Sequence, residues 1–155
     1  MILHGWRIAK TKTQQGAFSG EGARLYGGRW NSRGIPVVYV SSTASLAVLE
    51  MLVHLGSEAL LNTYSLWHVQ FDESLVRKLD PVELREDWRS SPPPFEVQNI
   101  GDLWAKKRTS VILQVPSVIV PQESNYLINP RHPDFAQVRI GEPEQFALDS
   151  RLLRK

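Results

Sequence analysis

A strand that leads within a few residues into an apolar helix is the feature that most constrains the fold. Residues 37–40 read Val-Val-Tyr-Val, a β-branched run that is typical of a buried strand. Ser42 or Thr43 can then cap a helix that we expect to end at Leu55, with Gly56 as its C-terminal stop. A helix with so few polar residues is mostly buried. The segment therefore predicts a sheet with this helix packed on it.

The rest of the chain favours short strands over helices. Ser-Ser-Pro-Pro-Pro at residues 90–94 indicates a surface loop within one domain, because each proline removes a backbone donor and restrains the residue before it. Residues 16–28 predict a glycine-rich loop with a short turn at 23–26, and residues 123–130 predict a polar, aromatic loop. Helices are expected at 81–83 and 99–108, and strands at 2–8, 64–71, 110–115, 118–120 and, once or twice, between 136 and 148. This order predicts an α+β fold, a compact single domain over residues 1–155 with a mixed, mostly antiparallel β core and a few helices.

The composition argues against several classes of protein. The chain has 155 residues and no cysteine, which excludes disulfides and thiolate metal sites and fits a reducing cytoplasm. No apolar run approaches the ~20 residues that span a bilayer. The net charge is only +2 and the basic residues are dispersed, so we expect no direct nucleic-acid binding, which usually needs a continuous basic stripe. The four histidines lack metal-site spacing, and neither a P-loop nor a dinucleotide-binding glycine motif is present.

Glu50 is the charged residue that most needs an explanation, since it lies within the predicted apolar helix. A buried carboxylate without a partner is unfavourable or changes its pKa, so Glu50 requires either a cationic partner or a cleft. His54 lies four residues further on and shares the same helix face. A structural pair of Glu50 with a histidine or an arginine is one interpretation, and a catalytic carboxylate is the other.

Arg29, Tyr39 and Ser117 are the other candidates, and each also has an ordinary structural interpretation. Arg29 follows two glycines in Gly-Gly-Arg-Trp-Asn at residues 27–31. Glycines let a ligand approach the backbone closely, and a guanidinium can hold a phosphate with two bonds; an ordinary surface arginine is the alternative. Taken alone, Tyr39 is better explained as a core tyrosine with its hydroxyl hydrogen-bonded. Ser117 has no neighbouring histidine and no nucleophile-elbow motif, which argues against a serine hydrolase.

Six blocks of the sequence together resemble a known family, the RES-domain toxins of bacterial RES–Xre toxin–antitoxin systems. The blocks are WRI at 6–8, GGRWN at 27–31, VVY at 37–39, LAVLEMLVH at 46–54, VPS at 115–117 and NYLINPRHP at 125–133. The resemblance implies a fold similar to the ADP-ribosyltransferase toxins and an enzyme that attacks NAD. It also implies an Xre-like antitoxin partner that blocks the site, and we expect a homodimeric toxin within that complex.

The family's main positions are matched without departure by four residues, which the resemblance makes catalytic: Arg29, Tyr39, Glu50 and Ser117. Arg7 and Asn125 match less certain positions, and we expect them to bind NAD together with Arg29, Tyr39 and Ser117. Cleavage of the nicotinamide–ribose bond passes through an oxocarbenium-like state, as in glycoside hydrolysis. Nicotinamide in NAD is already a cation and leaves neutral, so a single carboxylate is sufficient.

This chemistry gives each side chain an expected role. Glu50 would orient a ribose hydroxyl and stabilise the cationic sugar, and Arg29 would hold the pyrophosphate or the ribose. Tyr39 would stack on the positively charged nicotinamide ring, and Ser117 would bind the nicotinamide amide or the ribose. NAD is then a substrate, and we expect no resident cofactor or metal.

The leading hypothesis is a cytoplasmic toxin that degrades NAD as a glycohydrolase or a phosphorylase. The alternative is a mono-ADP-ribosyltransferase that modifies a specific protein. A non-catalytic interaction or nucleic-acid-binding module ranks below both.

Overall fold

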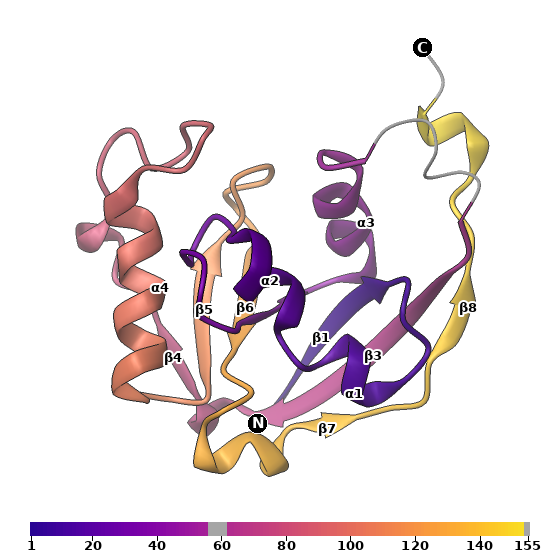
Figure 1. The fold of residues 1–155 in the computed structure, drawn as a ribbon, viewed down its shortest axis with the longest axis horizontal. Coiled ribbons are helices and arrows are strands. Elements are labelled where there is room, and N and C mark those ends of the chain that lie inside the picture. The colour runs from indigo at the N-terminus through magenta and orange to yellow at the C-terminus, as the bar shows by residue number, and fades with distance from the viewer. Residues whose placement is uncertain (56–61, 154–155) are drawn as a thin grey trace.

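The computed structural model describes residues 1–55 and 62–153, and the predicted helix stop at Gly56 lies outside them. Within the described residues, eight strands form one sheet with the order β4-β5-β6-β2-β1-β3-β7, and β8 also pairs with β3 (Figure 1). The β4–β5 pair is parallel, and the other pairs are antiparallel. The strands are β1 (Ile2–Ala9), β2 (Val38–Ser41), β3 (Tyr64–Asp72), β4 (Val76–Lys78), β5 (Ile112–Pro116), β6 (Ser124–Ile128), β7 (Arg139–Ile140) and β8 (Glu144–Phe146).

The helices are short except for one. They are α1 (Gln14–Ala17), α2 (Glu21–Tyr26), α3 (Ala44–Leu52) and α4 (Phe95–Lys107), with 3-10 turns η2 (Glu73–Leu75), η3 (Pro81–Glu83), η4 (Pro133–Gln137) and η5 (Ser150–Leu153). The mixed sheet with these helices confirms the predicted α+β class. Among the described residues, no helix combines the length and the apolar content needed to cross a membrane.

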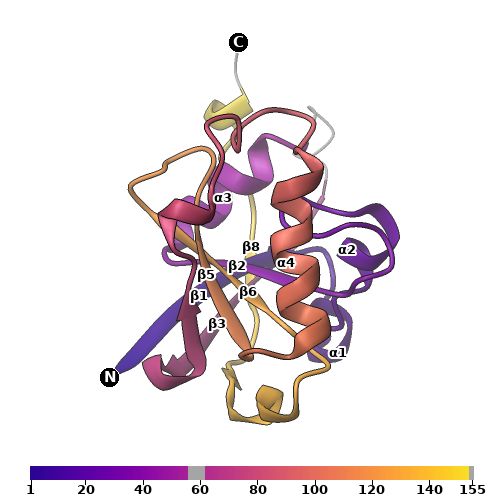
Figure 2. The ribbon, with the colours of Figure 1, turned by 90° about the vertical axis from the view of Figure 1, so that its left-hand side faces the viewer.

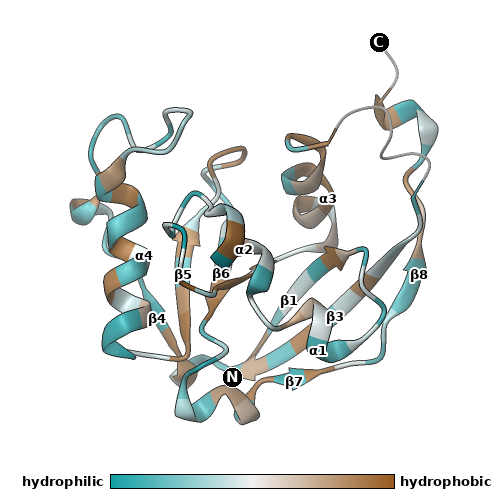
Figure 3. Cartoon of the chain, viewed as in Figure 1, coloured by the Kyte–Doolittle hydropathy of each residue, from teal (hydrophilic) through white to brown (hydrophobic). Residues whose placement is uncertain are grey.

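The two faces of the sheet are covered by different helices. On one face, Val40 and Val69 pack with Ala17 of α1. On the other face, Leu127 packs against α4, which runs over β5 and β6 (Figure 2). α3 lies against the end of β1 on this second face, where Val48 and Ile8 both pack against the cluster of Tyr64 and Leu148. β5 in the middle of the fold is largely apolar and β8 at its edge is hydrophilic, while polar residues alternate with apolar ones along α4 (Figure 3). The polar site forms on this second face, where Glu50 of α3 meets residues at the ends of β5 and β6.

Several predicted elements are confirmed with small shifts of their ends. Thr43 caps α3, since its Oγ1 accepts a hydrogen bond from the N–H of Leu46 at 3.0 Å. The helix ends at Leu52, three residues before the predicted end. The turn after Asp80 has the predicted capping box. α4 begins at Phe95, four residues before its predicted start, directly after a proline whose extended conformation suits the N-cap.

Three predictions were wrong. The expected strand at 118–120 does not form, because the N–H groups of Ile119 and Val120 donate to Ser117 Oγ, each at 3.1 Å. The expected loop at 123–130 instead contains β6, in which residues 125–128 are buried, so the strand is covered on both faces. The stretch 16–28 contains α2 and the end of α1, which Thr13 caps through the N–H of Gly16 at 3.1 Å.

Helix α4 approaches the loop before β2 so closely that only glycine fits at one position. A Cβ on Gly101 would lie 1.7 Å from the carbonyl oxygen of Trp30, whereas a Cβ on Gly22 in α2 would meet no atom within 4 Å. We therefore predict that Gly101→Ala lowers the free energy of unfolding by about 1–3 kcal/mol through overpacking. Gly22→Ala is the matched control and should raise it by roughly 0.5–1 kcal/mol. Equal effects of the two substitutions in denaturant unfolding would contradict this close packing.

Candidate active site

Glu50 is the centre of a polar cluster that three separate parts of the chain form. Its side chain comes from α3 and is half-buried. Its Oε1 accepts one hydrogen bond from Ser117 Oγ at 2.7 Å and another from Asn125 Nδ2 at 2.8 Å. Within the described residues, Oε2 accepts no hydrogen bond. One carboxylate oxygen is thus fixed by two hydrogen bonds.

Ser117 and Asn125 are themselves held in place. Ser117 is fully buried, and its hydroxyl donates to Glu50 while it accepts from two backbone N–H groups of the following turn. Asn125 Oδ1 accepts from Ser41 Oγ at 2.7 Å, which fixes the amide so that its Nδ2 points at Glu50. Sequence reasoning missed Ser41, although its place at the end of β2 opposite Asn125 of β6 puts the two side chains on one face.

The Ser117 contacts lead to a prediction about stability as well as activity. Ser117→Ala leaves two partly buried backbone N–H groups without their acceptor, so we expect a loss of about 2 kcal/mol in the free energy of unfolding. The same substitution removes a hydrogen-bond donor from Glu50, so any activity that depends on this carboxylate should fall as well. Chemical denaturation measures the first effect, and Ser19→Ala at an exposed serine is the control. A Ser117→Ala protein as stable as the control would contradict these contacts.

Arg29 is presented by a tight turn. Gly28 and Asn31 form an antiparallel bridge, with Arg29 and Trp30 between them. Arg29 is half-buried, and its Nη1 donates to the carbonyl oxygens of Trp88, at 3.2 Å, and Ser90. Burial lowers the pKa of Arg29 from its ordinary value, while the charge of Glu50 acts in the opposite direction. Among the described residues, no hydrogen bond joins the Arg29 guanidinium to Glu50, whose carboxylate is bound by Ser117 and Asn125.

Tyr39 fixes the same turn from the sheet. Its hydroxyl donates to Asn31 Oδ1 at 2.5 Å and accepts from the N–H of Trp30 at 3.2 Å. A Cβ on Gly28 would lie 2.7 Å from that hydroxyl, which explains why the second glycine precedes the arginine. Burial raises the pKa of Tyr39 above its ordinary value, so the phenol is neutral at physiological pH. The structure therefore brings Arg29, Tyr39, Glu50, Ser117 and Asn125 to one face of the sheet.

Arg7 lies apart from this group. Arg7 lies two residues after Gly5 on β1, so the two residues are on the same face of the sheet. Gly5 faces Val40 and Val69, on the face opposite the side chains of Tyr39 and Ser41. Arg7 Nε donates to the carbonyl oxygen of Ala17 at 2.7 Å, and its Nη1 to that of Tyr39 at 3.1 Å. Burial lowers the pKa of Arg7 to about 10. These contacts join α1 to the sheet, and a role of Arg7 in NAD binding stays a prediction.

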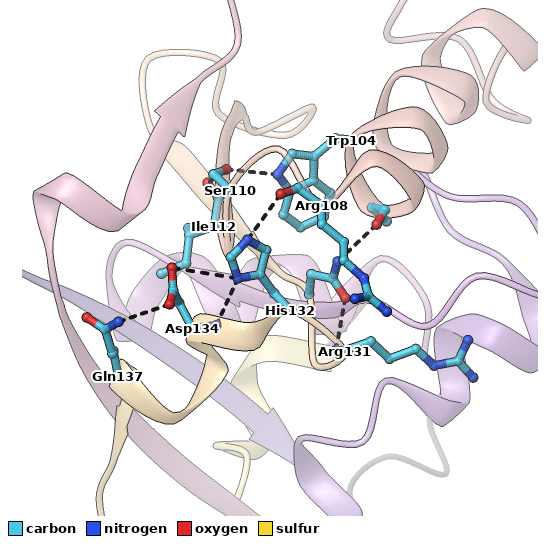
Figure 4. Close-up of polar contacts among 10 residues, drawn as sticks. Trp104, Arg108, Ser110, Ile112, Arg131, His132, Asp134 and Gln137 are labelled. Carbon is cyan, nitrogen blue, oxygen red and sulfur yellow. Dashed lines mark hydrogen bonds and ion pairs between the residues drawn. The ribbon is translucent and has the colours of Figure 1, made fainter.

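Two other polar features lie outside the cluster. His54 follows the end of α3 and is exposed, and no hydrogen bond or ion pair between it and Glu50 appears among the described residues. His132 stabilises the far end of α4: its Nε2 is 3.1 Å from the carbonyl oxygen of Arg108, and its Nδ1 accepts from the N–H of Asp134 at 2.9 Å (Figure 4). The block around His132 therefore has a structural role.

The cavities described on the surface are separate from the Glu50 cluster. Two cavities on the described surface lie elsewhere, one beside Phe18 and Phe135 and the other beside Ile35 and Lys106. Among the described residues, no group of three or more histidine or acidic side chains could hold a metal ion. What the cluster offers is a fixed carboxylate, an arginine and a neutral phenol, which suit an anionic ligand that develops positive charge nearby.

Comparison with known proteins identifies the family. The RES domain matches residues 4–149. A protein named Toxin Res from Photorhabdus laumondii is 41% identical over 155 residues, which cover 99% of this chain and 98% of that protein. A Prs ADP-ribosylating toxin from a Sphingobium species is 38% identical over 161 residues, which cover 100% of this chain and 99% of that protein. The chain belongs to the RES-domain family.

A solved structure shares the fold. The crystal structure of the M. tuberculosis MbcT-MbcA toxin-antitoxin complex contains a chain that matches with a TM-score of 0.74 and 21% sequence identity. The match covers 99% of this chain and 88% of that chain. The α+β arrangement described above is therefore that of a known toxin–antitoxin component.

Proposed function

We propose that this protein is the toxin of a toxin–antitoxin system and that it cleaves the nicotinamide–ribose bond of NAD. The observation that carries the proposal is Glu50, whose Oε1 is fixed by Ser117 and Asn125 and whose Oε2 has no partner among the described residues. Membership of the RES-domain family and the names of the relatives support the toxin role. NAD in the cytoplasm would be the substrate.

The proposed reaction balances without an acid catalyst. The bond between ribose C1′ and the nicotinamide nitrogen breaks, and its electron pair stays on that nitrogen, so nicotinamide leaves neutral. The positive charge moves to the ribose as an oxocarbenium-like state. The fixed carboxylate of Glu50 would stabilise the transition state more strongly than the ground state, because the positive charge on the ribose develops only in the transition state. Water, phosphate or a protein side chain then adds to C1′ and loses a proton.

The remaining residues position the substrate and the carboxylate. Among the described residues, the Arg29 guanidinium donates only from Nη1, to the carbonyl oxygens of residues 88 and 90. Its other N–H groups would hold the pyrophosphate. Tyr39 would stack through its half-buried ring while its hydroxyl holds the turn. Ser117 would act by orienting Glu50, since its hydroxyl hydrogen is already used; the expected direct bond to nicotinamide would require that contact to open.

A product analysis tests the proposed reaction. Purified protein is incubated with NAD labelled in the adenine ring, with and without inorganic phosphate, and the labelled products are separated. We expect free nicotinamide in equal amount to the NAD consumed, with the label in ADP-ribose or in its phosphorylated form. NAD that stays intact under all these conditions, with a folded protein, would contradict the proposal.

Mono-ADP-ribosylation of a protein is the second candidate. The 38%-identical relative from Sphingobium carries the name Prs ADP-ribosylating toxin, and the bond that breaks in NAD is the same. The label would then move onto a protein band in a cell extract. The two activities differ only in which nucleophile reaches C1′, so the same five residues of the site serve both.

We propose an Xre-like antitoxin as the partner and a homodimeric toxin within the complex. The structural neighbour is part of a toxin-antitoxin complex, which supports a partner protein for this fold. Light scattering of the toxin, alone and with a co-expressed antitoxin, measures both assembly states.

A further inference from the structure

The turn that carries Arg29 is held by one face of α4 as well as by Tyr39. Gln98 Nε2 donates to the carbonyl oxygen of Gly28 at 2.9 Å and to that of Asn31 at 3.2 Å. These are the two residues that bracket Arg29 and Trp30. A single side-chain amide therefore closes the base of the turn.

One helical turn further along α4, Asp102 holds the segment that leaves the turn. It is only 5% exposed. Its Oδ1 accepts from the N–H of Ser32 at 2.9 Å, and its Oδ2 accepts from the hydroxyl of the same residue at 2.5 Å. Residues four apart on a helix share a face, so Gln98 and Asp102 form hydrogen bonds with the turn and with the residue after it from the same side of α4.

Between these two residues, the backbone of α4 lies unusually close to the turn. Gly101 lies between Gln98 and Asp102 on this face and brings the helix backbone against Trp30. No described basic group forms an ion pair with Asp102, and its two oxygens both accept hydrogen bonds from Ser32. A buried carboxylate with two such bonds is a costly arrangement for mere packing, which suggests that the position of the turn matters.

We propose that Gln98 and Asp102 are positioning residues that set where the Arg29 guanidinium lies relative to Glu50, and thereby the affinity for the phosphate-bearing half of the substrate. This inference rests on the proposed reaction with NAD. Arg29 would hold the pyrophosphate equally in the ground state and in the transition state. A displaced turn therefore weakens substrate binding more than it slows bond cleavage.

Gln98→Glu is the sharpest test, because it keeps the shape of the side chain and replaces the donor by an acceptor that faces two carbonyl oxygens. We expect the KM for NAD to rise by about tenfold, as for the loss of one well-made hydrogen bond, with kcat changed much less. Lowering the pH protonates the introduced carboxyl, which then donates one hydrogen bond to the turn, so the KM relative to the parent protein should partly recover.

Gln114→Glu is the matched control. Gln114 is also half-buried and donates from Nε2 to Ser124 Oγ at 3.0 Å, but it aligns with Tyr126, on the face of the sheet away from Glu50. This variant should keep the parent KM at every pH. If Gln98→Glu keeps the parent KM, or if Gln114→Glu raises KM equally, the positioning role is wrong.

A second readout is independent of the reaction. Amide hydrogen exchange at Gly28 and Trp30, whose N–H groups bond to Asn31 O and Tyr39 Oη, should be faster in Gln98→Glu than in the parent protein. Unchanged exchange would overturn the inference even if NAD is cleaved. If exchange is faster in Gln98→Glu but the parent protein leaves NAD intact, the proposed function is wrong, while the role of Gln98 in holding the turn stands.

Discussion

Glu50→Gln is expected to abolish most of the NAD-cleaving activity while the protein stays folded. The glutamine carbonyl oxygen can still accept the hydrogen bonds of Ser117 and Asn125, which Glu50 Oε1 accepts in the structure, so the local geometry is kept. Only the negative charge is lost. Removal of one group that stabilises developing charge typically costs about 10²–10³ in kcat, and we expect a loss of that size.

The measurement is the rate of nicotinamide release, with thermal unfolding as the check on folding. Glu123→Gln provides the control, since Glu123 precedes β6 near the same site but has an exposed side chain. The control should keep the parent rate. A Glu50→Gln protein that releases nicotinamide at more than about a tenth of the parent rate would show that the carboxylate charge does not carry the step.

Arg29→Lys is expected to have the second-largest effect. Lysine keeps the charge but has a single ammonium group in place of the planar fork. That group can satisfy the carbonyl oxygens of residues 88 and 90, to which Nη1 now donates, or it can reach the substrate, but not both. The loss of one charge-assisted hydrogen bond corresponds to about 10–100-fold in kcat/KM, mainly through KM.

Steady-state kinetics at several NAD concentrations separate KM from kcat. Arg33→Lys is a suitable control because Arg33 is exposed and lies just beyond the same turn. If Arg29→Lys and Arg33→Lys both keep the parent kcat/KM, Arg29 does not hold the substrate, and its role is confined to fixing the loop at residues 88–90.

Much of the fold could be predicted from the sequence because local signals are strong where apolar periodicity and capping agree. The cap at Thr43 and the capping box at Asp80 are examples, since each depends on residues a few positions apart. The expected strand at 118–120 failed because a side chain accepted the hydrogen bonds of the backbone donors. Ser117 Oγ accepts from two N–H groups, and the apolar residues 118–120 therefore form a turn although their composition suits a strand.

The candidate site could be predicted only in part. Arg29, Tyr39 and Glu50 follow one another at short intervals and stand out by residue type. Ser41, Gln98 and Asp102 do not, because their importance depends on partners that lie 84, 70 and 70 residues away along the chain. Gln98 and Asp102 are ordinary polar residues of a helix, and Ser41 is an ordinary serine at the end of a strand, so the neighbouring sequence gave no signal of these contacts.

The most direct test of the central claim is the NAD content of bacteria in which this chain is induced. We predict that NAD falls before growth stops when the parent protein is made. Cells that make equal amounts of Glu50→Gln should keep both their NAD and their growth. Growth arrest at constant NAD, or equal toxicity of the two proteins, would contradict the conclusion that the chain acts by consuming NAD through Glu50.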